Sequence, residues 1–286
     1  PMPGLAVEQL TLGQFRSHTL TRVAAEGRTV AITGPNGAGK TNILEAISMR
    51  SPGRGLRRAA PGELARQPEA LGWRVRAELT SLGQIHDLVT GAEGDTSRSV
   101  EIDGKSAPQA ALGRIARVVW RIPVMDRLWV EGASERRRFL DRLTLSQIPD
   151  HGELALTYEK AMRERNRLLK DQVRDPAWYG ALERQMAEAG AALTVNRLEA
   201  IAALEAAQTL RETAFPTARL ALVAEGPILT EADALAGALA EGRFRDLAAG
   251  RTLIGPHRAD LDADYVAKDV AARLCSTREQ KALLLA

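Results

Sequence analysis

Hydrophobic and polar positions follow different periods in the two parts of the chain. Up to about residue 122, short alternating or apolar stretches typical of β-strands lie between turn residues. Trp73–Leu79 alternates, as a half-buried strand does. This pattern predicts further strands at Leu5–Leu12, Arg28–Thr33, Ser97–Glu101 and Arg117–Trp120, a hairpin turn at Asp103-Gly104 and a helix at Thr41–Met49.

From Glu135 to about residue 214, helical periodicity dominates. Two long helical blocks, roughly 151–172 and 178–213, are separated by the helix-breaking sequence Arg174-Asp175-Pro176. The second block is rich in Ala, Leu and Glu, which predicts an antiparallel helical hairpin or a short coiled-coil arm. Strand character returns at Ala218–Val223, and another helix starts at Ser276.

Composition excludes several classes of protein. The 286 residues are 45% hydrophobic and 26% charged, which excludes wholesale disorder and a collagen-like chain. No apolar run is long enough to span a membrane, and residues 1–10 lack the apolar core of a signal peptide. The single cysteine, Cys275, cannot form an internal disulfide. We therefore expect a cytoplasmic protein without a membrane partner.

The charge of the chain is only mildly basic, at +3. Only six of its 39 basic residues are lysines, and the others are arginines. Codon usage in a GC-rich genome explains this bias, and so does recognition of phosphate, which the guanidinium fork fits well. Composition leaves both explanations open.

One motif in the strand-rich part carries recognisable chemistry. It is Gly34-Pro35-Asn36-Gly37-Ala38-Gly39-Lys40-Thr41, which fits G-x-x-x-x-G-K-[ST] between a predicted strand and a predicted helix. The glycines let the backbone wrap around phosphate, and the N-terminus of the helix attracts anions. We expect Lys40 to reach the β- and γ-phosphates of ATP and Thr41 to ligate Mg²⁺. The alternative is a glycine-rich turn that serves only tight packing.

Several further segments resemble a family of P-loop ATPases. The P-loop and the following Thr41–Ala46 resemble the ABC-type ATPases of chromosome maintenance, namely SMC, Rad50 and RecF. Four later segments resemble RecF signatures in the same order: Pro52–Arg58, Arg136–Asp141, Arg165–Lys170 and Gly255–Leu261. The resemblance covers residues 5–286 and is strongest to alphaproteobacterial members of the RecF family.

The resemblance implies an α/β fold, namely the P-loop ATPase head of the ABC type. This head would consist of a Rad50-like lobe and an inserted second lobe that is helical or forms a short coiled-coil arm. We divide the chain into an ATPase lobe at 1–122, a helical lobe at 123–250, and a return to the first lobe at 251–286. The family implies an ATP-dependent homodimer on double-stranded and gapped DNA, with slow ATP hydrolysis. It further implies RecR- and RecO-type partners, recombinase loading, roles in the SOS response and replication restart, and a location at the nucleoid.

Other expected site residues come partly from the resemblance. Arg16 matches an arginine that contacts nucleotide phosphates in this group, and a solvated strand arginine is the alternative. Arg16 and Asn42 complete the set of residues that we expect to bind the nucleotide, together with Gly34–Thr41. Arg54, Arg57 and Arg58 form a basic run suited to DNA phosphates, or else a solvated loop. The Arg136–Arg138 run is a family signature, and salt bridges between the lobes are the alternative.

The sequence departs from the family pattern near its end. Ser276-Thr277-Arg278-Glu279-Gln280 stands where the family has the signature S-x-G-[EQ]-Q. In the family this signature faces the nucleotide of the partner subunit, so the resemblance assigns that role here to Ser276, Arg278 and Gln280. Ser276 and Glu279 form a capping box, so a helix begins here. Glycine at the third position lets the backbone approach phosphate. Arg278 therefore predicts an impaired ATP sandwich, although substitution of its charge for the lost contact, or a solvated side chain, are alternatives.

The Walker B aspartate and catalytic glutamate of the family would follow residue 286. We therefore expect either a fragment or a protein with little hydrolysis, and no catalytic residue is assigned. The leading hypothesis is a RecF-like DNA-binding ATPase. The alternatives are a nucleotide-gated DNA-binding protein, the ATPase subunit of a transporter and, least supported, a structural coiled coil.

Overall fold

The structure is a computed structural model that describes residues 4–94, 96–210 and 213–285. The chain forms two compact units, Pro1–Trp120 and Arg121–Ala286, each described by itself. Among the described residues, no helix combines the length and the apolarity needed to cross a bilayer.

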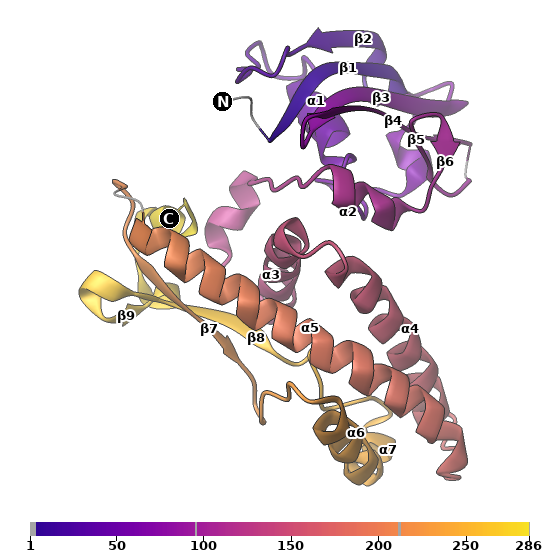
Figure 1. The fold of residues 1–286 in the computed structure, drawn as a ribbon, viewed down its shortest axis with the longest axis vertical. Coiled ribbons are helices and arrows are strands. Elements are labelled where there is room, and N and C mark those ends of the chain that lie inside the picture. Colours follow the sequence, from indigo (N-terminus) through magenta and orange to yellow (C-terminus); the bar gives the residue numbers. More distant parts are fainter. Residues whose placement is uncertain (1–3, 95, 211–212, 286) are drawn as a thin grey trace. The chain divides into compact units, whose positions relative to one another are not determined.

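The first unit is built on a six-stranded sheet that curves over helix α1 (Figure 1). All neighbouring strands are antiparallel, in the order β2-β1-β3-β4-β5-β6. The strands are β1 (Leu5–Phe15), β2 (His18–Ala24), β3 (Gly72–Ser81), β4 (Gln84–Glu93), β5 (Ser99–Ile102) and β6 (Lys105–Ser106). The helices are α1 (Lys40–Ser48), η1 (Pro61–Leu64), η2 (Gln109–Ala111) and α2 (Leu112–Ile115).

The core of this unit joins one face of the sheet to α1. Alternation along β1 and β3 turns Leu10, Leu12 and Val75 inward, where each is almost fully buried. Ala46 and Met49, from α1 and the residue after it, pack in the same cluster. Burial of this apolar surface fixes α1, and with it the end of the P-loop, against the sheet.

Two predicted strands in the first unit are wrong. Residues 29–33 and 116–120 form no strand, although the patterns Arg28–Thr33 and Arg117–Trp120 are apolar enough. A strand needs a neighbour to accept its ladder hydrogen bonds, and neither segment has one among the described residues. Val30 and Val119 are about half exposed as a result. The structure confirms the other predicted strands, the turn at Asp103-Gly104 and the helix at Thr41–Met49. Their observed ends differ from the predicted ones by three residues or fewer.

The second unit combines helices with a small sheet. Its helices are η3 (Pro123–Arg127), α3 (Ala133–Gln147), α4 (His151–Lys170), α5 (Ala177–Leu210), α6 (Ala232–Glu241), α7 (Arg243–Ala249), η4 (Val266–Lys268), η5 (Ala272–Leu274) and α8 (Thr277–Leu285). Its strands β7 (Ala218–Val223), β8 (Asp260–Tyr265) and β9 (Val270–Ala271) form an antiparallel sheet in the order β7-β8-β9.

Helices α4 and α5 form the predicted antiparallel hairpin (Figure 1). The break at Pro176 and the strand at Ala218–Val223 are also confirmed. Arg211 and Glu212, at the predicted end of the second helical block, lie outside the described residues. The hairpin is packed rather than free along much of its length, because one face of α5 is buried against neighbouring elements from Tyr179 to Ile201.

A buried ionic network fixes the far end of this hairpin. Arg165 in α4 is fully buried, and its guanidinium donates to Glu183 of α5 at 3.1 Å and to Asp246 of α7 at 2.7 Å. Arg243 also binds Glu183, at 2.6 Å. Arg165 is the first residue of the Arg165–Lys170 segment that resembles a RecF signature, so this segment has a structural role, joining α4 to α5 and α7.

Residues 251–285 pack within the second unit. Strand β8 pairs with β7, and α8 packs against η3. The three-part division at 1–122, 123–250 and 251–286 stays a prediction.

Candidate nucleotide-binding site

The glycine-rich segment forms a loop that leads directly into α1. Gly39 is the N-cap residue of the helix and has a φ of 85°, in the left-handed region that favours glycine. A Cβ at this position would lie 2.6 Å from Nε2 of His18, so any other residue would meet the neighbouring strand. The sequence G-K-T therefore fits this turn for a steric reason as well as a chemical one.

Lys40 lies across the loop. Its Nζ donates hydrogen bonds to the carbonyl oxygens of Gly34 at 2.8 Å and Pro35 at 2.7 Å. The ammonium is thus held over the loop, and the first residues of α1 present their backbone N–H groups there. Thr41, in the first turn, is exposed. This donor set suits phosphate and Mg²⁺: a cation over a glycine loop, a helix N-terminus and an exposed hydroxyl.

The turn between β1 and β2 is fastened to the P-loop. The Nε2–H of His18 donates to the Gly39 carbonyl at 3.2 Å, and its Nδ1 accepts from the Thr21 hydroxyl at 2.8 Å. The amide of Asn42 donates to Oγ of Ser17 at 2.8 Å. Because of these bonds, the turn and the N-terminus of α1 form one polar surface.

Arg16 lies in this turn and is bound rather than solvated. Its Nε and Nη2 donate to the two carboxylate oxygens of Glu45, at 2.9 and 2.8 Å, and its Nη1 donates to the carbonyl of Glu63 at 2.8 Å. The arginine therefore differs from the solvated strand residue that was the alternative. Its contact with a nucleotide phosphate stays a prediction.

The basic run after α1 divides into residues with different surroundings. Arg57 donates to Oδ1 of Asn42 at 2.8 Å and to Oε2 of Glu45 at 3.1 Å. Arg54 and Arg58 are exposed on the same loop. Sequence reasoning grouped the three as DNA contacts and missed Glu45, a fully buried carboxylate one helical turn after Thr41.

The signature segment lies in the second unit and begins α8. Ser276 and Glu279 form the predicted capping box: the Ser276 amide donates to Oε2 of Glu279 at 2.8 Å, and the Glu279 amide donates to Oγ of Ser276 at 3.4 Å. Hydrogen bonds from Lys268 and Ser276 lower the pKa of Glu279 to about 2. Arg278 is exposed, whereas Gln280 is buried and donates to the Cys275 carbonyl at 2.8 Å.

The two remaining signatures interlock within the second unit. Arg136 of α3 donates to both carboxylate oxygens of Asp260 in β8, at 2.9 and 2.7 Å. Asp141 of α3 accepts from Arg197 of α5 at 2.7 and 3.0 Å. The Arg197 side chain also donates to the Pro256 carbonyl at 2.7 Å. These ion pairs join α3, α5 and β8, all within one compact unit.

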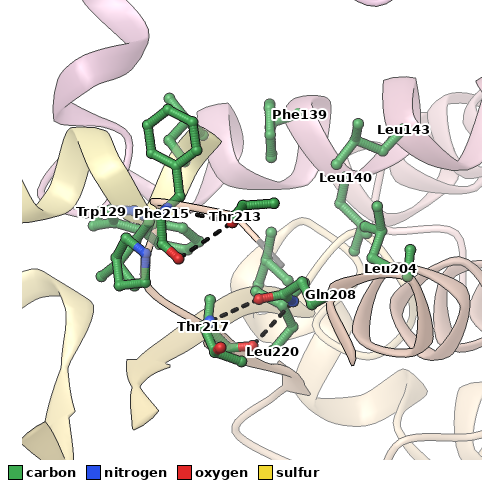
Figure 2. A pocket seen from close by; sticks show the side chains of 16 residues that line it. Trp129, Phe139, Leu140, Leu143, Leu204, Gln208, Thr213, Phe215, Thr217 and Leu220 are labelled. Carbon is green, nitrogen blue, oxygen red and sulfur yellow. Dashed lines mark hydrogen bonds between the residues drawn. The ribbon is translucent and has the colours of Figure 1, made fainter. Parts of the chain in front are cut away.

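A cavity of about 820 Å³ lies in the second unit and is lined mainly by apolar side chains (Figure 2). Trp129, Phe139 and Leu140 line part of it, and Gln208 holds the backbone of Ala218 through two hydrogen bonds. None of the described lining residues is charged. Phosphates need cationic or N–H donors, so this cavity is unsuited to a nucleotide.

Groups of three or more potential ligand side chains for a metal are absent from the described residues. A Mg²⁺ ion bound with a nucleotide at the P-loop would meet the exposed Thr41 hydroxyl and phosphate oxygens. No metal centre independent of the nucleotide is supported by the described residues.

Comparison with known proteins identifies the class and the family. A family profile described as "AAA domain" matches residues 9–64, which contain the P-loop. The chain superposes on the solved structure of the recombination mediator protein RecF with ATP, with a TM-score of 0.84 and 22% sequence identity, covering 99% of this chain and 79% of that one. A second RecF structure also gives a TM-score of 0.84. The fold is that of an ABC-type P-loop ATPase head with an additional helical lobe.

Relatives of high identity specify the family. The chain is 45% identical over 291 residues to the DNA replication and repair protein RecF of Rhizobium rhizogenes, covering 98% of this chain and 78% of that protein. It is 45% identical to the RecF proteins of Mesorhizobium japonicum and Caulobacter vibrioides, covering 77% and 79% of their lengths and 98% and 99% of this chain. The chain belongs to the RecF family. This membership gives no support to a transporter ATPase or a structural coiled coil.

Proposed function

We propose that this chain is an ATP-dependent DNA-binding protein of DNA repair and replication. The observation that carries the proposal is Lys40 held across the glycine loop at the N-terminus of α1, in a chain of the RecF family. Its relatives are named DNA replication and repair proteins. The proposed nucleotide-binding residues are Gly34–Thr41 with Asn42 and Arg16.

In the proposed mechanism, ATP with Mg²⁺ supplies the negative charge that the loop is shaped to receive. Lys40 exchanges its two carbonyl partners for phosphate oxygens, and the Thr41 hydroxyl ligates the metal. The N–H groups of the loop and of α1 orient the phosphates. Arg16, held by Glu45, adds a guanidinium beside them.

Dimerisation would complete the site. We propose that two copies close over two nucleotides and that each offers Ser276 and the N-terminus of α8 to its partner's phosphates. Closure would bring basic residues together into a surface for double-stranded or gapped DNA. The matched RecF structures are described as a recombination mediator protein in a pathway named RecFOR, which supports RecO- and RecR-type partners for this chain. Recombinase loading is part of the same proposal.

Arg278 favours a second version of this function, a nucleotide-gated DNA-binding protein with little hydrolysis. Its exposed side chain stands where the family has glycine, at the surface that would face the partner's phosphate. Glycine lets a backbone come close, and a side chain keeps it away. ATP would then bind and promote dimerisation while turnover stays slow.

DNA binding at different nucleotide states tests the proposal. Fluorescence anisotropy of a labelled gapped duplex is measured with ATP, with ADP and without nucleotide, for the wild-type chain and for Lys40→Ala. We expect ATP to strengthen binding about tenfold or more, and Lys40→Ala to abolish this difference. DNA affinity that is the same in all three states would contradict an ATP-dependent function.

A further inference from the structure

Two arginines from different segments share one buried carboxylate beside the P-loop. Glu45 is fully buried. It accepts hydrogen bonds from Nε and Nη2 of Arg16 at 2.9 and 2.8 Å, and from Nη1 of Arg57 at 3.1 Å. Arg16 lies in the turn after β1 and Arg57 in the loop after α1. Glu45 is therefore the meeting point of two segments that sequence reasoning assigned to different ligands.

The charges of this group do not balance. One carboxylate faces two guanidinium groups, so the trio carries one surplus positive charge. The carboxylate is inaccessible to water, whereas the side chains of Arg16 and Arg57 are 22% and 41% exposed. Partial burial strengthens charge interactions relative to water. An anion bound near the exposed edges of the two arginines would therefore be attracted.

The position of the group connects it to the nucleotide site. Glu45 follows Thr41 by four residues on α1, so both lie on the same side of the helix. Arg57 also binds Oδ1 of Asn42 at 2.8 Å, and the Asn42 amide donates to Ser17 in the turn that carries Arg16. Arg57 therefore contacts α1 at two residues and, through them, the turn after β1.

We propose that Glu45 is a positioning residue through which Arg57 acts on nucleotide binding, by holding Arg16 and the first turn of α1 in place. The inference rests on the proposed function, since it concerns ATP at the P-loop. It changes the role of Arg57 from a DNA contact to a member of the nucleotide site.

Two consequences follow from the shared carboxylate. Without Arg57, Glu45 neutralises Arg16 alone and Asn42 loses a partner, so the attraction for the triphosphate falls. A DNA phosphate that drew Arg57 away from Glu45 would act in the same direction, and by linkage ATP would weaken that one contact equally. The ATP-dependent rise in DNA affinity proposed above therefore has to come from residues other than Arg57. Arg54, which makes no ion pair among the described residues, has no such path to the nucleotide.

The test compares two arginines of one loop. ATP affinity is measured by calorimetry for the wild-type chain, Arg57→Ala, Arg57→Lys and the matched control Arg54→Ala, with thermal unfolding recorded for each. We expect Arg57→Ala to weaken ATP binding about three- to tenfold, Arg57→Lys to restore part of it, and Arg54→Ala to leave it unchanged. Both arginines are exposed, so these variants should fold.

A double-mutant cycle assigns the effect to Glu45. If Arg57 acts through this carboxylate, Arg57→Ala should have little further effect in a Glu45→Gln background. Equal ATP affinities of Arg57→Ala and Arg54→Ala would overturn the inference. This comparison does not depend on whether the Glu45→Gln protein folds. A wild-type chain that binds no ATP would instead overturn the proposed function, which distinguishes the two failures.

Discussion

The hydroxyl of Tyr158 in α4 donates a hydrogen bond of 2.7 Å to Nδ1 of His257, which lies 99 residues later in the chain. The Nε2–H of His257 donates to the Thr252 carbonyl at 3.1 Å. Burial lowers the pKa of the ring to about 4, so at neutral pH the ring is uncharged and carries its proton on Nε2. Both side chains are substantially buried. The pair fixes the Gly255–Leu261 signature to the helical hairpin.

Gly255→Ala should destabilise the second unit. Gly255 has a φ of 130°, a conformation that strains other residues, and an added Cβ would overlap the hydroxyl of Tyr158. We expect a loss of about 2–4 kcal/mol in the free energy of unfolding, measured by urea denaturation. Gly226→Ala is the matched control, because nothing lies within 4 Å of its Cβ.

The hydroxyl itself can be tested in the same series. Tyr158→Phe removes the atom that an alanine at 255 would meet, so Gly255→Ala should cost less in that background than in the wild type. Identical costs in the two backgrounds would show that backbone conformation alone requires glycine here.

His257 should make stability depend on pH. Burial lowers its pKa from 6.5 to about 4, so between these values the unfolded chain binds a proton that the folded chain does not. The stabilisation is therefore present above pH 6.5 and is lost as the pH falls toward 4, on the order of 3 kcal/mol in full. Urea unfolding of the wild type and His257→Gln at neutral pH and at about pH 5 isolates this contribution. An unchanged difference between the two proteins would refute it.

Arg278→Gly should raise ATP turnover. In the proposed dimer, removing the side chain would let the start of α8 approach the partner subunit's nucleotide phosphate. We expect a rise of about three- to tenfold in kcat with gapped DNA present, equivalent to ~0.6–1.4 kcal/mol in the barrier. Arg278→Lys keeps the bulk and the charge and should resemble the wild type. Equal turnover of Arg278→Gly and the wild type would remove the steric explanation.

The exposed arginines Arg54 and Arg58 should contribute to DNA binding through charge. Each arginine that contacts a DNA phosphate contributes about 0.9 to the slope of log affinity against log salt concentration. Arg54→Ala and Arg58→Ala should each flatten this slope by that amount, with little effect on ATP affinity. A slope that stays the same in both variants would mean a solvated loop without DNA contacts.

Local signals in the sequence predicted those elements whose formation depends on nearby residues. The P-loop helix, the hairpin turn at Asp103-Gly104 and the capping box of Ser276 and Glu279 all depend on residues a few positions apart. The strands predicted at Arg28–Thr33 and Arg117–Trp120 did not form, because a strand depends on a partner that its own pattern does not specify.

Buried charges, in the nucleotide site and in the helical hairpin, were the part of the structure that the sequence could not predict. Glu45 and Arg165 are polar residues on helices whose patterns are equally compatible with exposure. Their partners, Arg16 for the first and Asp246 for the second, come from segments 29 and 81 residues away. Only the fold brings these groups together, although their presence in family signatures was a signal that each had a specific role.

The measurement that tests the account most directly is calorimetry of ATP with Mg²⁺ on the wild-type chain and on Lys40→Ala. The account predicts saturable binding to the wild type and its loss in the variant. Thermal unfolding without nucleotide should stay unchanged, because the Lys40 ammonium donates to two carbonyls of its own exposed loop and to no other group among the described residues. Equal ATP affinity in the two proteins would contradict a nucleotide site at Gly34–Thr41.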